Sequence, residues 1–528
     1  MIKAVLSRAA IKKADKATIE EFGIPEISLM ENAGRLVIKS VEKNYGELLR
    51  KRVVIVCGKG NNAGDGFVIA RALYSKGCSI KVLLLFPDQI SEGSTLSNLK
   101  LLRTIKDNDL EQRLSIESYK DFTQLRDYKE ADFYIDAVFG TGLNRELPEK
   151  IKRLVDWFNE RKAPKISIDI PSGLNGDDGT IFGACIKADL TITMASLKLG
   201  MVLNDGPKVT GQIEVADIGI PQFILDKCAK SDNSAFSLDD ETVKNWLPQR
   251  TNDPHKYSVG SLLIVAGSKG MTGAATLCSM GAQRIGAGII TCACPESVLP
   301  ILANKLTEVV TLPLPETSDA TIAGKALKIL LSKSDKSQSA LIGCGLGRNE
   351  ETQKFVVDFL HAYKKPLVID ADALFALVGS IKQFPLSDLS QGKWILTPHW
   401  GEFKRLAGID EQLNYFARMN LAREKAKEWN CIILLKGMPS LVALPDGRVF
   451  INFTGNAAAA TAGTGDVLSG LCAGLLAQGL SSEQAALASI YIAGTCADRY
   501  IQRFDARTMI ASDVIEQLPH VLKERFNF

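Results

Sequence analysis

A short glycine-rich stretch near the C-terminus combines residues that could transfer a phosphate. "TAGTGDVLSG", Thr461–Gly470, places two glycines around a threonine, then an aspartate, then an apolar helical run. Glycines before a helix let backbone N–H groups surround an anion, which the helix dipole also attracts. The same dipole favours the ionised form of Asp466, which can then act as a base at neutral pH. The alternative is an ordinary capping aspartate after a flexible loop.

Similar stretches follow other expected strands in the same half. Each combines glycines with a polar or basic residue: "GSKGMTGAA" (267–275), "GCGLG" (343–347), "TPHWGEF" (397–403) and "LLKG" (434–437). The motif G-x-x-x-x-G-K-[ST] does not occur, which excludes a Walker-type phosphate grip. Loops that follow parallel strands meet at one edge of a sheet. The set therefore predicts a ribokinase-like domain, in which a glycine–aspartate loop supplies both the anion hole and the base.

A second glycine-rich turn lies in the N-terminal half. "CGKGNNAGDGFVIARAL" matches G-x-G-x-x-A through Gly58, Gly60 and Ala63, so it could bind a dinucleotide. A tight strand-to-helix turn without a ligand would have the same pattern. A ligand is favoured by side-chain oxygens that such a turn does not need, those of Asn61, Asn62 and Asp65.

Two further acids end strands in this half. Asp136 lies near the end of "DFYIDAVFG", and Asp169 ends "KISID". A single acid at a strand end is usually a helix cap or a loop anchor. Two acids and two glycine loops at one sheet edge exceed what capping requires, so we predict a binding site there. Asn62, Asp136 and Ser172 offer only oxygen donors, which suit an alkali or alkaline-earth cation.

The pattern along the chain predicts two α/β domains. Apolar, β-branched runs alternate with helical patterns from 52–58 to 211–219 and again from 260–267 to 431–437. A polar stretch without a strong strand separates the two series. We predict an N-terminal Rossmann-like three-layer sandwich, a linker and a C-terminal ribokinase-like three-layer sandwich, with the bounds 1–225, 226–240 and 241–528.

The composition limits the classes of function. The 528 residues are 46% hydrophobic and 23% charged, with a formal net charge of +3, and the basic residues are dispersed. This balance gives no reason to expect nucleic acid. The cysteines are scattered without a C-x-x-C pair, as in proteins of a reducing compartment. With no signal peptide pattern and no run long enough for a bilayer, we expect a cytoplasmic protein that binds no membrane.

The N-terminal half, to about residue 220, resembles the NAD(P)H-hydrate epimerase domain. The matching stretches stand in the order of that family: "LMENAG" (29–34), "GKGNNAGDG" (58–66), "DAVFGTGL" (136–143), "DIPSGL" (169–174) and "KLG" (198–200). Ala63 stands where the family usually has glycine. Its methyl group could crowd a phosphate, although alanine tolerates the same backbone angles except those with positive φ.

The resemblance implies a set of ligand contacts. It implies that the hydrated dinucleotide contacts Asn61, Asn62, Ala63, Gly64, Asp65, Gly140, Thr141, Gly142, Leu143, Asn144, Arg145, Glu146 and Asp169. It also implies a potassium ion held by Asn62, Asp136 and Ser172.

The reaction expected at this site is a proton transfer. Protonating the hydroxyl next to the ring nitrogen expels water, and water returning to the other face gives the opposite epimer. One carboxyl can serve as acid and then as base. We assign that role to Asp169 and leave Asp136 to the cation; the sequence leaves the reverse division open.

The C-terminal half, from about residue 235, resembles the ADP-dependent NAD(P)H-hydrate dehydratase domain. The glycine loops above match, as do "HK" (255–256), "RIGAG" (284–288), "DADAL" (370–374), "GN" (455–456) and "ARTMIASDVI" (506–515). The chain departs from the family at Cys344, which replaces proline, at Trp400, and at alanines 457–460, which replace proline and glycines. None of these changes removes a side chain to which we assign chemistry.

The resemblance implies two groups of residues around Asp466. It implies that the adenine nucleotide contacts Lys436, Gly437, Met438, Pro439, Ser440 and Gly465. It implies that the hydrate pocket is lined by Ala274, Gly345, His399 and Asp466. Asp466 would take the proton of the hydrate hydroxyl, which then attacks the terminal phosphate of ADP, with magnesium neutralising the transferring group.

Together the two halves predict a bifunctional repair enzyme for NADH hydrate and NADPH hydrate. It would interconvert the R and S epimers and dehydrate the S epimer with ADP, giving AMP and phosphate. One alternative is a ribokinase-like vitamin or sugar kinase with an appended domain, which would release a stable phosphorylated product. Another makes the N-terminal half a non-catalytic ligand-sensing module. The resemblance also implies a homo-oligomer.

Overall fold

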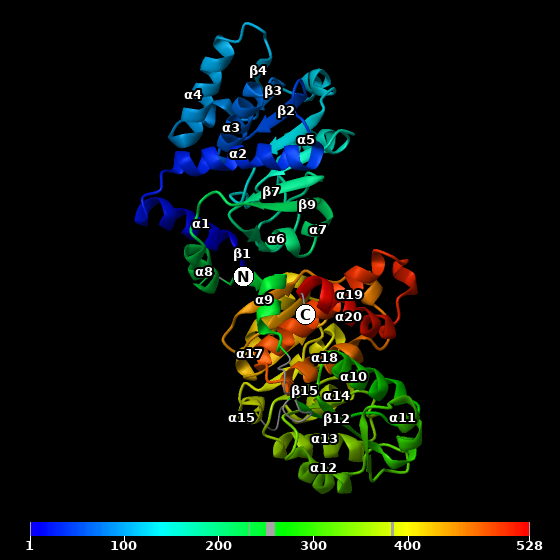
Figure 1. The fold of residues 1–528 in the computed structure, drawn as a ribbon. Helices are drawn as coiled ribbons and strands as arrows, with labels where there is room; N and C mark the ends of the chain where they lie inside the picture. The colour runs from blue at the N-terminus through cyan, green and yellow to red at the C-terminus, as the bar shows by residue number, and fades with distance from the viewer. Residues whose placement is uncertain (1, 232, 250–258, 382–384, 527–528) are drawn as a thin grey trace. The chain divides into compact units, whose positions relative to one another are not determined.

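The computed structural model describes residues 2–231, 233–249, 259–381 and 385–526. The chain forms two compact units (Figure 1), made mainly of Lys3–Ala235 and of Phe236–Phe528, with Asn414–Phe416 grouped with the first. We call them the N-terminal unit and the C-terminal unit. The expected linker contains the end of helix α8 (Gln222–Ser231) and strand β10 (Ala235–Ser237). The matching dipeptide 255–256 lies outside the described residues.

The N-terminal unit is built on a seven-stranded parallel sheet in the order β4-β3-β2-β5-β6-β7-β9. Its strands are β2 (Arg52–Cys57), β3 (Ser79–Leu84), β4 (Leu114–Ser118), β5 (Phe133–Ala137), β6 (Lys165–Ile168), β7 (Leu190–Met194) and β9 (Gln212–Ala216). Sequence patterning predicted all of these except β4, whose residues are only partly buried. Strands β1 (Lys3–Leu6) and β8 (Leu197–Lys198) form a parallel pair that is not part of this seven-stranded sheet.

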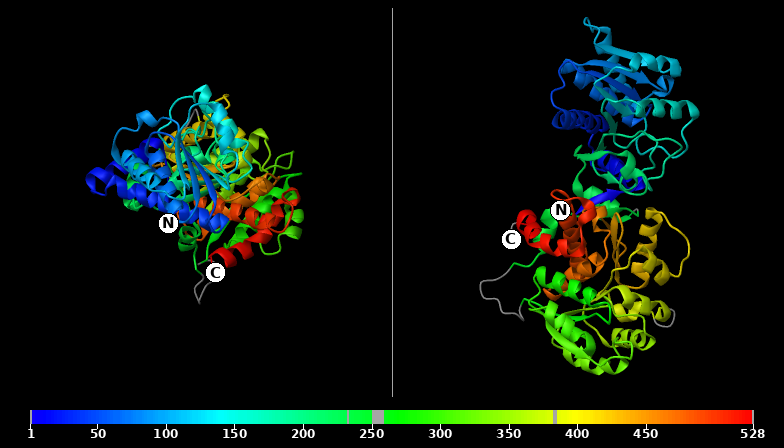
Figure 2. Two further views of the ribbon diagram at one scale, coloured as in Figure 1. Left: turned by 90° about the horizontal axis from the view of Figure 1, so that it is seen from above. Right: turned by 90° about the vertical axis from the view of Figure 1, so that its right-hand side faces the viewer.

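Helices cover both faces of this sheet (Figures 1 and 2). One layer contains α2 (Glu26–Tyr45), α3 (Asn61–Ser75) and α4 (Gly93–Asp107), and the other contains α5 (Glu149–Asn159). Alternation along β2 explains the two cores, because successive side chains of a strand point to opposite faces. Val54 and Val56 pack with Trp157 and Phe158 of α5, whereas Ile55 lies on the α3 side. The predicted three-layer sandwich is confirmed. Helices α1 (Arg8–Lys16), α6 (Leu199–Val202) and α7 (Gly206–Val209) lie in the connections.

The C-terminal unit is built on a longer sheet in the order β13-β12-β11-β14-β15-β16-β17-β18-β19-β10. Its strands are β11 (Ser261–Val265), β12 (Ile289–Pro295), β13 (Val310–Leu314), β14 (Ser339–Ile342), β15 (Leu367–Ile369), β16 (Trp394–Leu396), β17 (Ile432–Leu435), β18 (Ser440–Ala443) and β19 (Val449–Asn452). The pairs are parallel except in the antiparallel run β17-β18-β19. Strands β18 and β19 of this run were not predicted from the sequence. They have four residues each and no helix between them, so they lack the strand–helix alternation that marked the other strands.

Two sets of helices complete this unit. The first set contains α10 (Thr272–Arg284), α18 (Thr464–Ala477), α19 (Ser482–Ile501) and α20 (Ala511–Phe526). The second contains α13 (Glu350–Ala362), α14 (Ala371–Ser380) and α16 (Trp400–Ala407), which pack on one another in this order. The remaining helices are α9 (Asp240–Trp246), α11 (Leu299–Lys305), α12 (Leu327–Ser334), α15 (Leu386–Ser390) and α17 (Tyr415–Glu428). None of the helices in the described ranges is long and apolar enough to cross a bilayer.

Helix α18 is buried as its apolar sequence predicted, and it packs closely on α10. A Cβ at Gly470 would lie 2.1 Å from the carbonyl oxygen of Cys278, so a larger residue would push the two helices apart. The loop before α18 needs glycine too, because Gly463 has φ of +89°. The close packing and the turn together fix the position of the first turn of α18.

Candidate functional site

A cavity of about 530 Å³ opens in the N-terminal unit beside the ends of β2, β5 and β6. This is the carboxyl edge at which the strand order reverses between β2 and β5, the usual ligand position in such sheets. Most of the residues predicted to bind the dinucleotide line it: Asn61, Asn62, Asp65, Gly140, Thr141, Gly142, Leu143, Asn144, Arg145 and Asp169. The structure therefore brings the loops after three strands together.

Three predicted contact residues do not line this cavity. Ala63 is fully buried and has no positive φ, so its methyl group does not crowd a ligand there. Gly64 packs against α2, because a Cβ built on it would collide with the side chain of Met30. Glu146 is exposed and pairs with Lys152 at 3.7 Å. If these residues contact the ligand, only backbone atoms of the first two can do so.

Asp169 and Lys198 form an ion pair at the cavity wall. The Lys198 Nζ donates to Asp169 Oδ1 at 2.5 Å and also to Thr193 Oγ1 and the carbonyl of Met194. The other carboxylate oxygen of Asp169 lies toward Gly140, where a Cβ would be 3.2 Å away. Asp169 also has φ of +65°, an uncommon conformation for a residue other than glycine. One oxygen of Asp169 is thus held by the lysine, while the second is left for a ligand.

The predicted cation ligands include one side chain without partners. Asp136 is fully buried, and Ser172 donates to it from both Oγ (2.6 Å) and the backbone N–H (2.9 Å). Asn62 is 8% exposed, and within the described chain neither its Oδ1 nor its Nδ2 has a hydrogen-bond partner. The polar atoms of a buried amide normally have hydrogen-bond partners, so the amide of Asn62 is suited to bind a ligand. Oxygen donors of this kind suit potassium.

The cavity also contains ionisable residues to which we assigned no role from the sequence. These are Asp15 of α1, Glu26 at the start of α2, Lys59, and Lys198. Lys198 stands in the "KLG" stretch, which marked it as a matching residue but not as the partner of Asp169. Asp15 gave no signal, because α1 has charged residues at many positions, as exposed helices commonly do.

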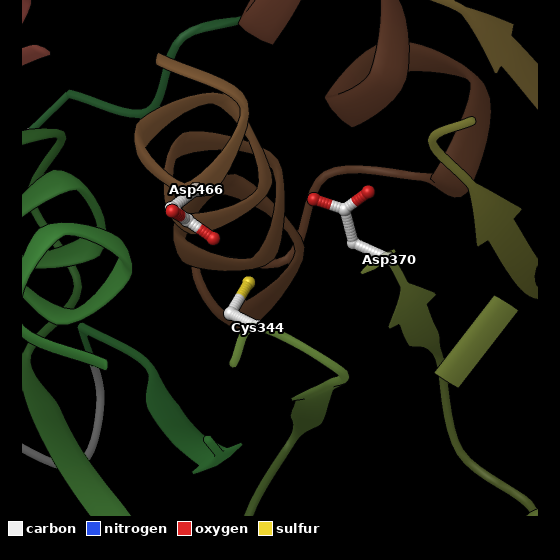
Figure 3. A group of neighbouring side chains, drawn as sticks. All are labelled: Cys344, Asp370 and Asp466. Carbon is white, nitrogen blue, oxygen red and sulfur yellow. The ribbon is translucent and has the colours of Figure 1, made fainter. Parts of the chain in front are cut away.

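In the C-terminal unit Asp466 lies in the first turn of α18, close to two residues from other strands. Figure 3 shows it near Cys344, in the turn after β14, and Asp370, at the end of β15. One ligand atom from each of the three lies within 4.8 Å of the others. Burial, together with the Asp370 carboxylate, raises the pKa of Asp466 to about 6. The helix dipole was expected to keep this group ionised; with a pKa near 6 it still is at neutral pH.

Lys436 connects Asp370 with the glycine loop. Its Nζ donates to Asp370 Oδ1 at 2.9 Å, and Ser469 Oγ donates to the other oxygen at 2.7 Å. A Cβ built on Gly465 would lie 3.3 Å from the same Nζ. Burial alone would lower the pKa of Lys436, but Asp370 and Glu402 raise it, so the ammonium is charged. The site thus holds a fixed cation beside an anion-binding loop.

The other residues predicted for this site lie on neighbouring turns. A Cβ on Gly345 would be 3.0 Å from the Cβ of Ala274, so these two residues are adjacent. His399 forms a backbone bridge with Lys436, but its Nδ1 accepts from Gly401 N–H at 3.0 Å and caps α16. The imidazole is therefore already used in part as a helix cap, although its side chain is 57% exposed.

The predicted nucleotide-binding turn follows β17. It consists of Lys436, Gly437, Met438, Pro439 and Ser440, and Ser440 Oγ donates to the carbonyl of Gly437 at 2.8 Å. Met438 is exposed, and its side chain is flexible and apolar.

Two carboxylates of this site fit a magnesium ion bound with a nucleotide. Magnesium is commonly held by one or two carboxylates and the substrate phosphates. Asp370 and Asp466 supply such oxygens, although both oxygens of Asp370 already accept hydrogen bonds. The sulfur of Cys344 is a poor ligand for this ion.

Comparisons with known proteins match both units. The family model "NAD(P)H-hydrate dehydratase" matches residues 262–520, and "YjeF-related protein N-terminus" matches residues 26–200. The chain is 43% identical to the bifunctional NAD(P)H-hydrate repair enzyme Nnr of Salinibacter ruber, over 99% of this chain and 96% of that protein. It is 38% identical to the enzyme of the same name from Moorella thermoacetica, over 98% and 96%.

A similar solved structure is the ADP/ATP-dependent NAD(P)H-hydrate dehydratase from Bacillus subtilis, co-crystallised with ATP/Mg2+. It is 30% identical, with a TM-score of 0.45, and the match covers 55% of this chain and 98% of that one.

Proposed function

The chain belongs to the family of bifunctional NAD(P)H-hydrate repair enzymes, and on that premise we propose how its two units divide the repair of damaged nicotinamide cofactors. The N-terminal unit interconverts the R and S epimers of NADH hydrate and NADPH hydrate. The C-terminal unit dehydrates the S epimer with ADP, releasing AMP, phosphate and the reduced cofactor. The two sites in one chain allow both epimers to be repaired.

In the N-terminal unit, the cavity holds the hydrated nicotinamide. The turn Asn61–Asp65 and the loop Gly140–Glu146 bind the dinucleotide, the former through the N-terminus of α3. Asp169 does acid–base work on the hydroxyl and on the water that returns to the ring. Support for this role comes from its second oxygen, which lies at the cavity, and from Lys198, which holds the first oxygen in an ion pair. Asp136 is fully buried and does not line the cavity, which supports giving it to the cation.

Potassium is our proposed ion for the N-terminal unit, held by Asn62, Asp136 and Ser172. When bound, it would supply positive charge beside the dinucleotide phosphates. The buried amide of Asn62 without a partner supports this assignment.

In the C-terminal unit, Asp466 takes the proton from the hydrate hydroxyl. The freed oxygen attacks the terminal phosphate of ADP, so that the O–P bond to the hydrate forms and the bond to AMP breaks. Phosphate then leaves with the ring carbon–oxygen electron pair, and the adjacent carbon gives up a proton to restore the reduced ring. Magnesium bound with the nucleotide would supply charge that stabilises the transferring phosphate.

The remaining residues of this unit bind and orient. Lys436 and the glycine loop hold the terminal phosphate of ADP, and the turn 436–440 holds the nucleotide. Ala274, Gly345 and His399 form the wall of the hydrate pocket. The position of the Lys436 ammonium beside Gly465 supports the phosphate assignment.

The single observation that carries the proposal is that one chain contains both sites, the N-terminal cavity and the cluster around Asp466. Relatives named as bifunctional repair enzymes match the chain over nearly its whole length. The test is to mix the chain with NADH hydrate and ADP and to follow the absorbance of reduced nicotinamide. We expect the absorbance to return fully and phosphate to be released in equal amount. A stable phosphorylated product without NADH would instead indicate a small-molecule kinase and overturn the proposal.

We also propose the domain boundaries, the cellular compartment and the oligomeric state of the enzyme. The epimerase spans residues 1–225 and the dehydratase 241–528, joined through 226–240. The protein works in the cytoplasm as a homo-oligomer. All eleven cysteines are buried and none forms a disulfide, which supports a reducing compartment.

A further inference from the structure

Epimerisation needs a proton donor as well as a base, and the N-terminal cavity offers several carboxyl groups. Expelling water from the hydrate requires a protonated acid near the hydroxyl, and adding water back requires an ionised base. The cavity is lined by four carboxyl groups: Asp15, Glu26, Asp65 and Asp169. Their surroundings differ enough to separate their roles.

Asp169 fits the base rather than the donor. Lys198 Nζ lies 2.5 Å from its Oδ1, and the N–H of Met194 donates to the same oxygen at 3.3 Å. The ammonium of Lys198 holds this oxygen, and the second carboxylate oxygen lies toward Gly140 at the cavity wall. That second oxygen is placed to accept a proton from water.

Glu26 and Asp65 are committed in other ways. Both oxygens of Glu26 accept hydrogen bonds, one from Asn61 Nδ2 and one from Ser94 Oγ, each at 2.9 Å. Asp65 is 9% exposed and belongs to the buried part of α3, and burial raises its pKa above the usual range. Glu26 is therefore an acceptor that anchors the turn, and Asp65 is enclosed by its own helix layer.

Asp15 differs from the other three carboxyl groups because it reaches the cavity from helix α1. The pKa of Asp15 is raised to about 6, and burial is the largest cause. The ammonium of Lys198 opposes this rise, whereas the carboxylates of Asp169 and Glu26 add to it. Asp65 faces it from α3. Helix α8 also packs on α1, but none of its charged residues, Asp226, Lys227 and Lys230, lines the cavity. Asp15 can therefore both hold and release a proton near neutral pH.

The same cavity contains an independent sign of a polar ligand. Asn62 is more than nine-tenths buried, and its amide atoms have no partner in the described part of the chain. Asn62 lines the cavity together with Asp15 and Asp169. The carboxyl groups thus face a space that is built to receive polar atoms.

We infer that Asp15 is a further catalytic residue of epimerisation, the acid that protonates the departing hydroxyl while Asp169 acts as the base. This inference rests on the proposed function of the N-terminal unit. The proton of Asp15 goes to the hydroxyl oxygen, the carbon–oxygen bond breaks as water leaves, and the ring nitrogen lone pair forms the C=N bond. A water then attacks that carbon and gives its proton to Asp169. Proton exchange through solvent returns Asp15 to its acid form, so no other reactant is needed.

The test follows a single purified epimer of NADPH hydrate in the full-length chain, with potassium present and ADP absent. Asp15→Asn keeps the shape of the side chain but removes its exchangeable proton. We expect kcat for epimerisation to fall about 10²-fold or more, with KM little changed. Asp15→Glu should recover part of the loss. In the wild type, kcat/KM should decline as pH rises through about 6, because the acid form disappears, and Asp15→Asn should lack this decline.

Glu20→Gln is the matched control, because Glu20 lies just beyond α1, is exposed, and forms an ion pair with Lys16 at 3.6 Å. It should match the wild type in every assay. Dehydration of the S epimer with ADP should be unchanged in all variants, and melting curves should show that Asp15→Asn folds. Wild-type epimerisation by a folded Asp15→Asn chain, with the same pH decline, would overturn the inference. A wild-type chain that does not interconvert the epimers would instead overturn the proposed function.

Discussion

Each unit has a lysine–aspartate pair at the carboxyl edge of its sheet, and the two pairs are inverted in their exposure. In the N-terminal unit the Lys198 side chain is 1% exposed and that of Asp169 is 15% exposed. In the C-terminal unit Lys436 is 21% exposed and Asp370 is 2% exposed. The first pair therefore presents a carboxylate to its cavity, and the second presents an ammonium to its glycine loop.

This inversion shows how one architecture can serve two reactions. Both units place their sites where parallel strands end, so the fold alone does not distinguish them. Moving a proton requires an exposed carboxyl group, whereas transferring a phosphate requires an exposed cation and a nearby base. Which partner of the pair is buried decides which reaction the edge can support.

The largest effect should come from removing the base of the C-terminal unit. Asp466→Asn preserves the shape of the side chain but should lower kcat for dehydration about 10²-fold or more, as expected for loss of a general base. Epimerisation should be unchanged, because Asp169 and its cavity belong to the other unit. Parallel assays of both reactions check this. Near-normal dehydration by the variant would exclude the role given to Asp466.

Replacing each lysine should affect only the reaction of the unit that contains it. Lys436→Met should raise the KM for ADP roughly tenfold to a hundredfold, because a charged hydrogen bond to phosphate contributes about 1.5–3 kcal/mol. Lys198→Met should leave that KM unchanged and slow epimerisation, because Asp169 would lose the ion pair that holds its carboxylate at the cavity wall. Steady-state kinetics of both reactions on both variants test the comparison. An increase in the KM for ADP in Lys198→Met would show that the pairs are not specific to their units.

The proposed cation site should make epimerisation by the N-terminal unit depend on potassium. Potassium should support epimerisation better than lithium or sodium, and a zinc chelator should have no effect. Asp136→Ala should reduce both the activity and its dependence on the cation, while dehydration is retained. Rates measured with each salt at constant ionic strength test this. Loss of epimerisation on chelation of a transition metal would contradict the proposed ligands.

The smallest effect should be a shift in pH dependence. Dehydration needs ionised Asp466, so its kcat/KM should rise as pH increases through about 6. A hydrogen bond from the Cys344 thiol lowers the pKa of this carboxyl. Cys344→Ala should therefore move the midpoint to higher pH, by less than about one unit, whereas Cys344→Ser should keep it near that of the wild type. A midpoint that moves to lower pH in Cys344→Ala would contradict this role for the thiol.

Sequence patterning predicted the central strands of both sheets because their apolar runs are continuous and separated by helices. It missed β18 and β19, which form a short antiparallel run, and β4 and β13, whose residues are mostly exposed or partly buried. It also missed the short strands β1, β8 and β10. The glycine loops and strand-end acids, such as Asp466 and Asp169, could be recognised because their positions at strand and helix ends are visible in the sequence.

Other features of the sites depend on distant contacts. The pairing of Lys198 with Asp169, and of Lys436 with Asp370, joins residues 29 and 66 positions apart. Asp15 reaches the cavity only because α1 lies beside segments from much later in the chain, where its first residue, Arg8, contacts Thr141 and Asp177. Its surrounding charges resemble those of any exposed helix in the sequence, so no local pattern could assign it a role.

The central claim, that the two units divide the repair, is tested most directly by complementation between full-length variants. An Asp169→Asn chain with ADP and a mixture of NADPH hydrate epimers should consume the S epimer and then stop, apart from slow spontaneous interconversion. Adding an Asp466→Asn chain, which retains the epimerase site, should restart the formation of NADPH and carry it to completion. The stop reflects the fixed geometry of the dehydratase site, which aligns one hydroxyl with Asp466 and the phosphate. If Asp169→Asn alone consumes both epimers at similar rates, the division of labour is wrong.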